Sequence, residues 1–352
     1  MSEVSPAGRR TRRGSPADGV WFSRLLAVVA ALLLATLLGG PAHGQEPTSA
    51  SEPWTYGPIG TIVAPHGAGV LLTNVATGDE QPLAVIPPVG VSGHAAWSPD
   101  GTQLAISRFG RQPGERVGGS DILVLPSSGG EAQPLVEHDQ DGVLLGVPAW
   151  LPDSSGLFYD YLAPDGSAAN TWVMYASMDP SLSPRTIATG GWPAVSPDGQ
   201  YLAFVRPSPT SRFLNELVIT DIAGITTWIL VPADKLVQIT SPRFSPDGKE
   251  IAFIGSVSVG EAAVPLDTGL TDIFMKGVMA HGPPGDVWVM SVAGGEAYRL
   301  TSFEEDEPTL AWSPDGYWIA MMGGEGMYLL PRDLSAPPRK IAKGGFGGID
   351  WR

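Results

Sequence analysis

The sequence contains no cysteine among its 352 residues. This absence excludes a disulfide framework, a thiolate zinc site, a cysteine nucleophile and a lipoprotein anchor attached through cysteine. Basic residues are also scarce, because 21 Lys and Arg stand against 36 Asp and Glu, for a formal net charge of −15. A body this acidic repels phosphate backbones and anionic lipid, so the composition argues against a nucleic-acid partner and against adsorption to a membrane.

Long hydrophobic runs are few, and the most prominent one lies near the N-terminus. Residues 25–38 are uncharged and follow an arginine-rich stretch between Arg9 and Arg13. The run is shorter than the roughly 20 residues of a membrane span, and small residues precede Gln45. We therefore expect residues 1–44 to be a signal peptide of an exported, periplasmic or extracellular protein, with an uncleaved N-terminal anchor as the alternative. A short Pro/Ser/Thr/Glu-rich linker, residues 45–59, follows.

Glycine and proline, by contrast, are abundant, with 45 and 34 residues. Some of them belong to one phrase, Ser-Pro-Asp-Gly or a close variant, which occurs five times behind an aromatic or apolar residue. Its aspartates follow one another at intervals of 45 to 68 residues, which is the period of a propeller blade plus insertions. They are Asp100, Asp153, Asp198, Asp247 and Asp315.

Each phrase has the chemistry of a tight hairpin. Pro fixes φ at the first corner, Asp accepts bonds from amides that follow it, and Gly adopts the left-handed conformation. Short apolar runs such as 104–106 and 251–254 flank the turns and have the length of strands. We interpret the five aspartates as structural turn residues rather than as repeated catalytic acids.

Two further strands follow each phrase, so that each repeat has four, as a propeller blade does. Residues 61–84 resemble a blade without its phrase, and residues 348–352 resemble an opening strand with nothing after it. Joined together, these two ends would complete a blade and close the ring. The sequence thus predicts an all-β, six-bladed β-propeller over residues 60–352. The expected blades are 60–85 with 347–352, 94–136, 147–189, 192–231, 241–301 and 308–342.

The repeated phrases are similar to the WD-repeat-like propeller units of the TolB periplasmic family and of prolyl-oligopeptidase-type peptidases. The resemblance covers about residues 60–352 and implies the fold. A TolB protein carries an α/β domain ahead of its propeller, whereas some 15 residues here separate the predicted cleavage site from the first blade. A peptidase would need a G-x-S-x-G nucleophile elbow, and the sequence has none.

In a four-stranded blade, the second-to-third strand loops and the blade-to-blade loops emerge on one face, here called the loop face. The phrase turns and the third-to-fourth strand turns emerge on the other, the turn face. The extra length of this chain lies on the predicted loop face, where binding usually resides. Its candidate binding residues are Phe274, Met275, Met279, Asp139, Asp141, Glu304, Glu305 and Asp306.

These candidates have simpler interpretations as well. The apolar residues of 270–279 have helical spacing, which suits either a Met-rich flap for a partner or a short helix packed on its own rim. Residues 139–142 resemble the start of a calcium-binding loop but lack the further ligands that such a loop requires. Residues 304–307 are interpreted as a solvated acidic rim.

We expect a non-catalytic binding or scaffold protein of the cell envelope that contacts a protein, peptide or glycan. No cofactor is predicted, although calcium in the central channel is compatible with the sequence. The alternative is an enzyme of the metal-dependent lactonase or sugar-dehydrogenase kind with its site at that channel. The histidines show no metal-ligand spacing and no serine or cysteine partner.

Overall fold

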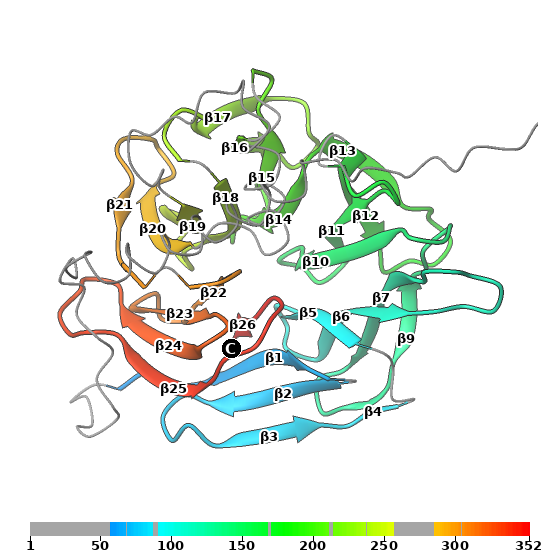
Figure 1. The fold of residues 1–352 in the computed structure, drawn as a ribbon, viewed down its shortest axis with the longest axis horizontal. Helices are drawn as coiled ribbons and strands as arrows, with labels where there is room; N and C mark the ends of the chain where they lie inside the picture. The colour runs from blue at the N-terminus through cyan, green and yellow to red at the C-terminus, as the bar shows by residue number, and fades with distance from the viewer. Residues whose placement is uncertain are drawn as a thin grey trace, which may run out of the picture. The chain divides into compact units, whose positions relative to one another are not determined.

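The computed structural model describes residues 57–67, 69–86, 91–167, 170–210, 214–236, 238–256, 285–303 and 305–352, all within the unit Gln45–Arg352. The 26 elements in these ranges are all strands. Six antiparallel four-stranded sheets surround a central channel, so the predicted six-bladed propeller is confirmed (Figure 1). No helix with the length and hydrophobicity of a membrane span occurs in the described ranges.

The first three blades are given from the channel outward. Blade 1 consists of β26 (Asp350–Trp351), β1 (Thr61–His66), β2 (Gly69–Asn74) and β3 (Glu80–Leu83). Blade 2 consists of β5 (Val91–Trp97), β6 (Gln103–Gly110), β7 (Gly119–Pro126) and β9 (Gln133–Val136). Blade 3 consists of β10 (Leu144–Trp150), β11 (Gly156–Leu162), β12 (Thr171–Ser177) and β13 (Arg185–Thr189). A small parallel pair, β4 (Val85–Ile86) with β8 (Gly130–Glu131), links the outer parts of blades 1 and 2.

The remaining blades repeat the same order. Blade 4 consists of β14 (Gly191–Val195), β15 (Tyr201–Pro207), β16 (Asn215–Asp221) and β17 (Thr227–Val231). Blade 5 consists of β18 (Gln238–Phe244), β19 (Glu250–Ser256), β20 (Asp286–Ser291) and β21 (Tyr298–Arg299). Blade 6 consists of β22 (Thr309–Trp312), β23 (Trp318–Met322), β24 (Gly326–Pro331) and β25 (Arg339–Lys343).

The ring closes inside blade 1, where segments from opposite ends of the described chain pair. Strand β26 lies antiparallel to β1, with Ile62 opposite Trp351 and Val63 opposite Asp350. Figure 1 shows β26 at the channel end of this blade, beside β1. The shared blade predicted from the sequence is therefore present. Closure removes the two open edges that would otherwise face each other at the seam.

The phrase turns explain why this short motif recurs. In blade 2, the Ser98 hydroxyl donates to Asp100 at 2.6 Å and accepts from the Gln103 amide at 2.9 Å. Gly101 follows with φ of 70°, in the left-handed region. All five phrase aspartates accept bonds within their own turns: Asp100, Asp153, Asp198, Asp247 and Asp315. Blade 3 departs from the pattern, because Ser154 occupies the left-handed position there with φ of 59°.

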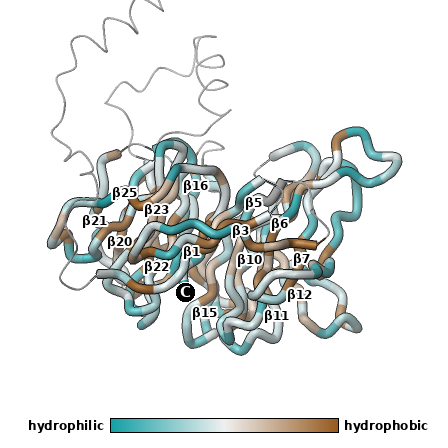
Figure 2. Tube along the Cα trace, turned by 90° about the horizontal axis from the view of Figure 1, so that it is seen from below, coloured by the Kyte–Doolittle hydropathy of each residue, from teal (hydrophilic) through white to brown (hydrophobic). Residues whose placement is uncertain are grey.

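The core lies between neighbouring blades, where the strands are hydrophobic and the turns at either end are hydrophilic (Figure 2). One cluster, for example, joins Val63 and Val70 of blade 1 to Leu104 and Leu123 of blade 2. Indole groups at the ends of inner strands also reach back to the preceding blade. Trp150 donates to the Ala96 carbonyl at 3.2 Å, and Trp312 donates to the Arg243 carbonyl at 3.0 Å. These two tryptophans therefore combine apolar packing with a directional bond across a blade boundary.

Candidate functional site in the central channel

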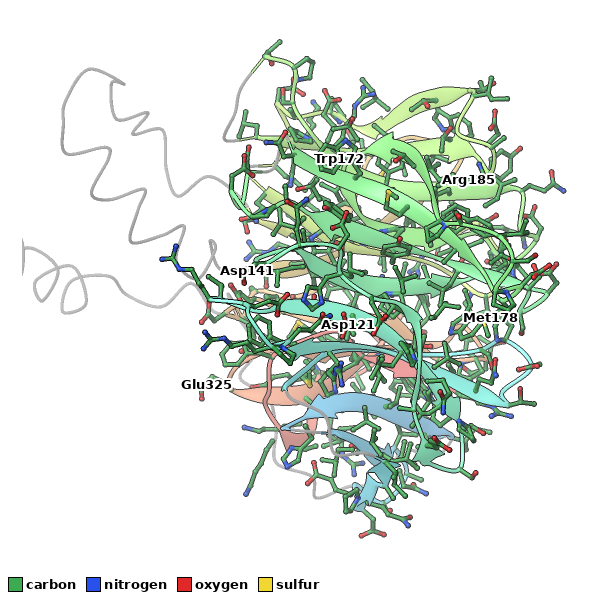
Figure 3. The ribbon with its side chains drawn as sticks, turned by 90° about the vertical axis from the view of Figure 1, so that its right-hand side faces the viewer. Asp121, Asp141, Trp172, Met178, Arg185 and Glu325 are labelled. Carbon is green, nitrogen blue, oxygen red and sulfur yellow. The ribbon has the colours of Figure 1, made fainter. Side chains whose placement is uncertain are left out.

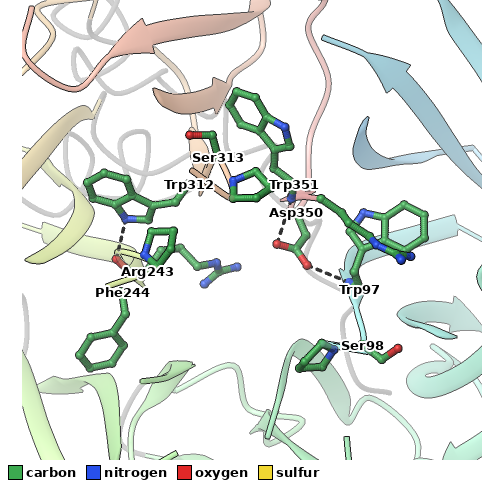
Figure 4. Close-up of a pocket in the computed structure, with 12 residues that line it drawn as sticks. Trp97, Ser98, Arg243, Phe244, Trp312, Ser313, Asp350 and Trp351 are labelled. Carbon is green, nitrogen blue, oxygen red and sulfur yellow. Dashed lines mark hydrogen bonds between the residues drawn. The ribbon is translucent and has the colours of Figure 1, made fainter. Parts of the chain in front are cut away.

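A cavity of about 310 Å³ opens at the turn-face end of the channel. Its walls come from the ends of four inner strands and from the phrase turns that follow three of them (Figure 4). The aromatic part of the lining consists of Trp97, Phe244, Trp312 and Trp351. The hydroxyls of Ser98 and Ser313, together with Arg243, Asp350 and Arg352, supply the polar part. A concave, aromatic-rich cavity with a few polar groups is the usual form of a small binding site.

Two charged side chains from blades on different sides of the ring project into this cavity, as Figure 4 shows. Arg243 is the second-to-last residue of β18 in blade 5, and Asp350 begins β26 of blade 1. The Asp350 carboxylate accepts the Trp97 amide at 2.8 Å and the Trp351 amide at 3.0 Å, so it joins blade 1 to blade 2. Burial raises the pKa of Asp350, while these amides and the Arg243 charge act in the opposite direction.

Arg243 is the less satisfied of the two charges. One of its N–H groups donates to the Pro242 carbonyl at 2.9 Å. No carboxylate lies within ion-pair distance of its guanidinium in the part of the chain that the structure describes. Burial lowers the pKa of Arg243 and Asp350 counters this, but a guanidinium stays protonated in proteins. The cavity therefore contains a positive charge with donors available to a ligand.

A further polar group of the channel lies deeper, on β5. The His94 ring packs edge-on against Trp192, with centroids 5.5 Å apart, and its Nε2 is buried without a hydrogen-bond partner among the described residues. Burial, followed by the charge of Arg243, lowers the pKa of His94 to about 3. The imidazole is thus neutral at ordinary pH.

Asp160 lies on β11, the second strand of blade 3, and reaches a bulge in β10. Its carboxylate accepts the Trp192 amide at 3.3 Å, and burial raises its pKa to about 6. A Cβ placed on Gly146 would come within 2.8 Å of Asp160 Oδ1 and 3.7 Å of His94 Nδ1. The glycine therefore leaves space at the bulge between these two groups.

Bulges in the inner strands determine which side chains reach the channel. The register shifts between Gly146 and Ala149, between Gly191 and Ala194, and between Thr240 and Arg243. At each shift a non-glycine residue with positive φ precedes a proline: Val147 (46°), Trp192 (57°) and Ser241 (51°). Bulges redirect side chains, and backbone strain of this kind is concentrated at functional sites. In all three blades the proline stands four residues before the phrase proline, a repeat in the sequence that identifies the bulges in retrospect.

On the loop face, the two predicted aspartates are occupied by contacts within the protein. Asp141 accepts the amides of Arg116, Val117 and Gly118 at 2.8 to 2.9 Å, and this holds its pKa below the ordinary value. Asp139 accepts the Tyr161 hydroxyl at 3.0 Å. Figure 3 shows Asp141 and Glu325 on this face, opposite Met178 and Arg185 near the turn face. Asp141 therefore fastens the blade 2 loop through three backbone amides.

The acidic segment ahead of blade 6 differs from the sequence interpretation. The solvated rim predicted for 304–307 is wrong for Glu305, which is only 6 % exposed and accepts the Glu325 amide at 3.2 Å. Asp306 is half-buried. The other loop-face candidates, Phe274, Met275, Met279 and Glu304, lie outside the described residues.

Sequence reasoning also missed a buried acid within the first three residues of the third strand in three blades. Each of these acids forms an ion pair with an arginine: Asp121 with Arg108, Glu216 with Arg206, and Asp286 with Arg299. The acids open the third-strand segments of their repeats, and this shared position was a usable signal in the sequence.

Blade 2 extends its ion pair into a buried network around His138. The imidazole contacts Asp121 through Nδ1 at 2.5 Å and Glu115 through Nε2 at 2.7 Å. Burial opposes protonation, but the bonds to the two carboxylates prevail and raise the pKa of His138. Both ring nitrogens are therefore engaged, and the His138 side chain is 1 % exposed. This network holds the blade 2 loop in place and leaves no ring nitrogen for a substrate.

No group of three metal-binding side chains is close enough to hold an ion within the described ranges. Neither a protein-family model nor a curated protein matches the sequence. Among solved structures, TolB from Acinetobacter baumannii aligns with a TM-score of 0.59 and 15 % identity, over 83 % of this chain and 66 % of TolB. A protein assigned as TolB from Agrobacterium tumefaciens gives 0.49 at 18 % identity, over 68 % and 80 % of the two chains. Hydrazine synthase from Kuenenia stuttgartiensis gives 0.49 at 17 % identity, over 84 % and 81 %.

The protein is a six-bladed β-propeller, and its fold is similar to that of the Acinetobacter TolB structure. The chain spans slightly less than two thirds of the length of that TolB. At 15 % identity the alignment supports the architecture alone, so the chemistry has to be argued from the channel.

Proposed function

We propose that this protein is an exported, non-catalytic binding module of the cell envelope. Its ligand is a segment of a protein, peptide or glycan that carries a carboxylate. The observation that carries the proposal is Arg243, a guanidinium without a carboxylate partner in the described chain, inside an aromatic-walled cavity. Export is supported by the arginine-rich start and the apolar run of residues 25–38, which have the pattern of a signal peptide.

The chemistry of the lining favours this class of ligand. A guanidinium binds a carboxylate through two parallel hydrogen bonds, and such bonds are about twice as strong as those between neutral groups. The indole groups of Trp312 and Trp351 already donate to backbone carbonyls, at 3.0 Å each, so their contribution to a ligand is apolar surface. An anionic group beside a flat apolar or sugar ring therefore suits the cavity better than a cation or an aliphatic chain.

A matched pair of small molecules tests this chemistry. Indole-3-acetate and its uncharged amide share a ring and differ in the carboxylate, so calorimetric titration of both isolates the Arg243 contribution. We expect the acid to bind about tenfold or more tightly than the amide, because bonds to charged groups contribute about 1.5–3 kcal/mol. Arg243→Gln should abolish this preference. Lys249→Gln, which removes an exposed cation on the same turn face, should leave it unchanged.

Equal binding of the acid and the amide by the unaltered protein, or a preference that survives Arg243→Gln, would refute the assigned role of this cavity.

Crosslinking in envelope extract is a second experiment, and it identifies the natural partner. A partner captured by the unaltered protein and by Lys249→Gln, but lost with Arg243→Gln, is the expected result. Detection of the protein in the cytoplasmic fraction alone would refute export.

A second function is favoured by a different observation in the same channel. His94 has a buried, unpartnered Nε2, and the nearby Asp160 has its pKa raised to about 6. Perturbed groups of this kind are common at catalytic sites, which favours the propeller enzyme of the lactonase or sugar-dehydrogenase kind as the alternative. Chelator-sensitive turnover of a lactone that is lost with His94→Ala would support this alternative. Turnover that persists with that variant would exclude the channel histidine.

A further inference from the structure

The outermost strands of the blades differ in how they are protected. In a propeller each outermost strand leaves one row of backbone N–H and C=O groups unpaired, and such edges invite pairing with another chain. Natural sheets suppress this with charged residues, prolines or very short strands. Five blades do so here, with Glu80 and Pro82 in β3, Pro134 in β9, Arg185 in β13, Arg299 in the two-residue β21, and Arg339, Lys340 and Lys343 in β25.

Strand β17 of blade 4 has none of these devices. Its residues Thr227–Val231 include no charge and no proline, and no described strand pairs with its outer edge. Residues 225–229 are all exposed, including Ile225 at 82 %, Ile229 at 47 % and Trp228 at 37 %. Figure 1 places β17 at the outer rim of the ring. A β-branched and aromatic run of this kind on an open edge is a site of strand pairing.

The exposed run is held in a fixed conformation. Asp221 accepts the amides of Ala223, Ile225 and Thr226 at 2.7 to 3.1 Å and so fixes the turn ahead of β17. Trp228 packs edge-on against Tyr201, with ring centroids 5.5 Å apart. A strand that is already ordered loses little conformational entropy when another strand is added to it.

We propose that β17 pairs antiparallel with β17 of a second copy of this chain. Two identical strands pair antiparallel about a two-fold axis, so the contact is closed and does not propagate into a fibre. The absence of charge supports a second copy as the occupant, since no like charges face each other when β17 meets itself. The chain has a net charge of −15, so two copies repel each other over most of their surface. The uncharged edge of β17 is therefore the favoured place of contact.

The size of the contact sets its strength. A five-residue strand with two exposed apolar side chains, preceded by the exposed Ile225, offers less area than the roughly 800 Å² per partner of a stable complex. The dimer is therefore reversible and depends on concentration in the micromolar range. Sedimentation velocity of the full-length protein, from low to high micromolar concentration, should show a monomer converting to a dimer.

Single lysines on the edge provide the decisive comparison, because lysine is the natural protection of an edge strand. Ile229→Lys and Thr227→Lys should each shift the association at least tenfold toward higher concentration. Leu182→Lys places the same charge on an exposed apolar residue of blade 3, 59 % exposed, and should leave the dimer unchanged. Circular dichroism of each variant checks that the propeller remains folded.

Hydrogen exchange of the unaltered protein gives an independent measurement. Amides of residues 227–231 should become more protected as the concentration rises, while those of β13 should not change. A protein that stays monomeric throughout overturns the proposal, including the case in which a different chain occupies β17. A dimer that is insensitive to both lysine variants, or that forms without added protection in β17, overturns it equally.

Discussion

The inner-strand tryptophans allow a sharp test of the bond that joins neighbouring blades. Trp312 and Trp97 stand at the same position of their repeats, each directly before a Ser-Pro-Asp-Gly turn. The Trp312 indole donates to the Arg243 carbonyl at 3.0 Å, whereas the Trp97 Nε1 is buried with no hydrogen-bond partner in the described structure. Substitution by phenylalanine removes the same atoms from both sites. The two changes differ mainly in what happens to the indole N–H.

The expected magnitudes follow from this difference. Trp312→Phe loses a hydrogen bond and leaves the Arg243 carbonyl without this donor, which costs about 1–3 kcal/mol. Trp97→Phe removes a donor that was already unsatisfied, so the loss of ring packing is offset by relief of a desolvation penalty. We therefore expect Trp312→Phe to lower the free energy of unfolding by about 1–3 kcal/mol more than Trp97→Phe.

Urea denaturation followed by circular dichroism measures this difference, provided that the slope of the transition is equal for the two variants. Thermal melts give a second measure, with about 2 °C for each kcal/mol in a domain of this size. The Arg352 guanidinium lies 5.7 Å from the Trp97 ring, and a phenylalanine ring retains much of this contact. A Trp97→Phe variant that is destabilised as much as Trp312→Phe would show that the indole bond does not hold blades 5 and 6 together.

Three further predictions concern the turns and the titrating groups. Ser196→Ala should cost about 1–3 kcal/mol in denaturation, because it leaves the Tyr201 amide without the acceptor it has at 2.9 Å; an unchanged midpoint would contradict the turn mechanism. The pKa of Asp160 is raised to about 6, so its protonated form stabilises the fold fully below about pH 4, and this contribution disappears as the pH rises through 6. Asp160→Asn should therefore flatten the dependence of the melting temperature on pH between about 4 and 6. The pKa of His138 is also raised, here by bonds to two carboxylates, so the protonated imidazole stabilises the fold fully below about pH 6.5 and this stabilisation is lost as the pH rises through the raised pKa. His138→Gln should therefore remove the decline in melting temperature above neutral pH. A decline that persists in this variant would assign it to another group.

The sequence predicts the scaffold well because its signal is local. Proline, aspartate and glycine at fixed positions make a turn regardless of the rest of the chain, as the bonds of Ser98 and Asp100 show. Counting these turns gives five blades, and the unpaired ends at 61–84 and 348–352 supply the sixth blade and indicate how the ring closes. Turn chemistry and strand length carried this part of the prediction.

The channel could not be predicted in the same way, because its residues come from distant segments. The Trp97 amide and the Asp350 carboxylate are 253 positions apart in the sequence, and only closure of the ring brings them together. Bulges also interrupt the alternation of inward and outward side chains along the inner strands. A sequence period of two therefore does not identify the side chains that face the channel. Loop length pointed to the loop face, while the described cavity lies at the turn face. Loop length reports where the chain tolerates insertion, and a cavity can form from strand ends that carry no insertion.

The position of this cavity has a consequence for the mechanical behaviour of the ring. Blades pack against their neighbours, so a propeller can open at a single seam while its other contacts persist. Trp97 of blade 2, Arg243 of blade 5, Trp312 of blade 6 and Asp350 of blade 1 all border the same cavity. A ligand bound there would contact blades that are not neighbours in the ring, such as blades 2 and 5. Opening of any seam beside the ligand would disturb its contacts, so the occupied ring should resist unfolding in proportion to the logarithm of ligand concentration.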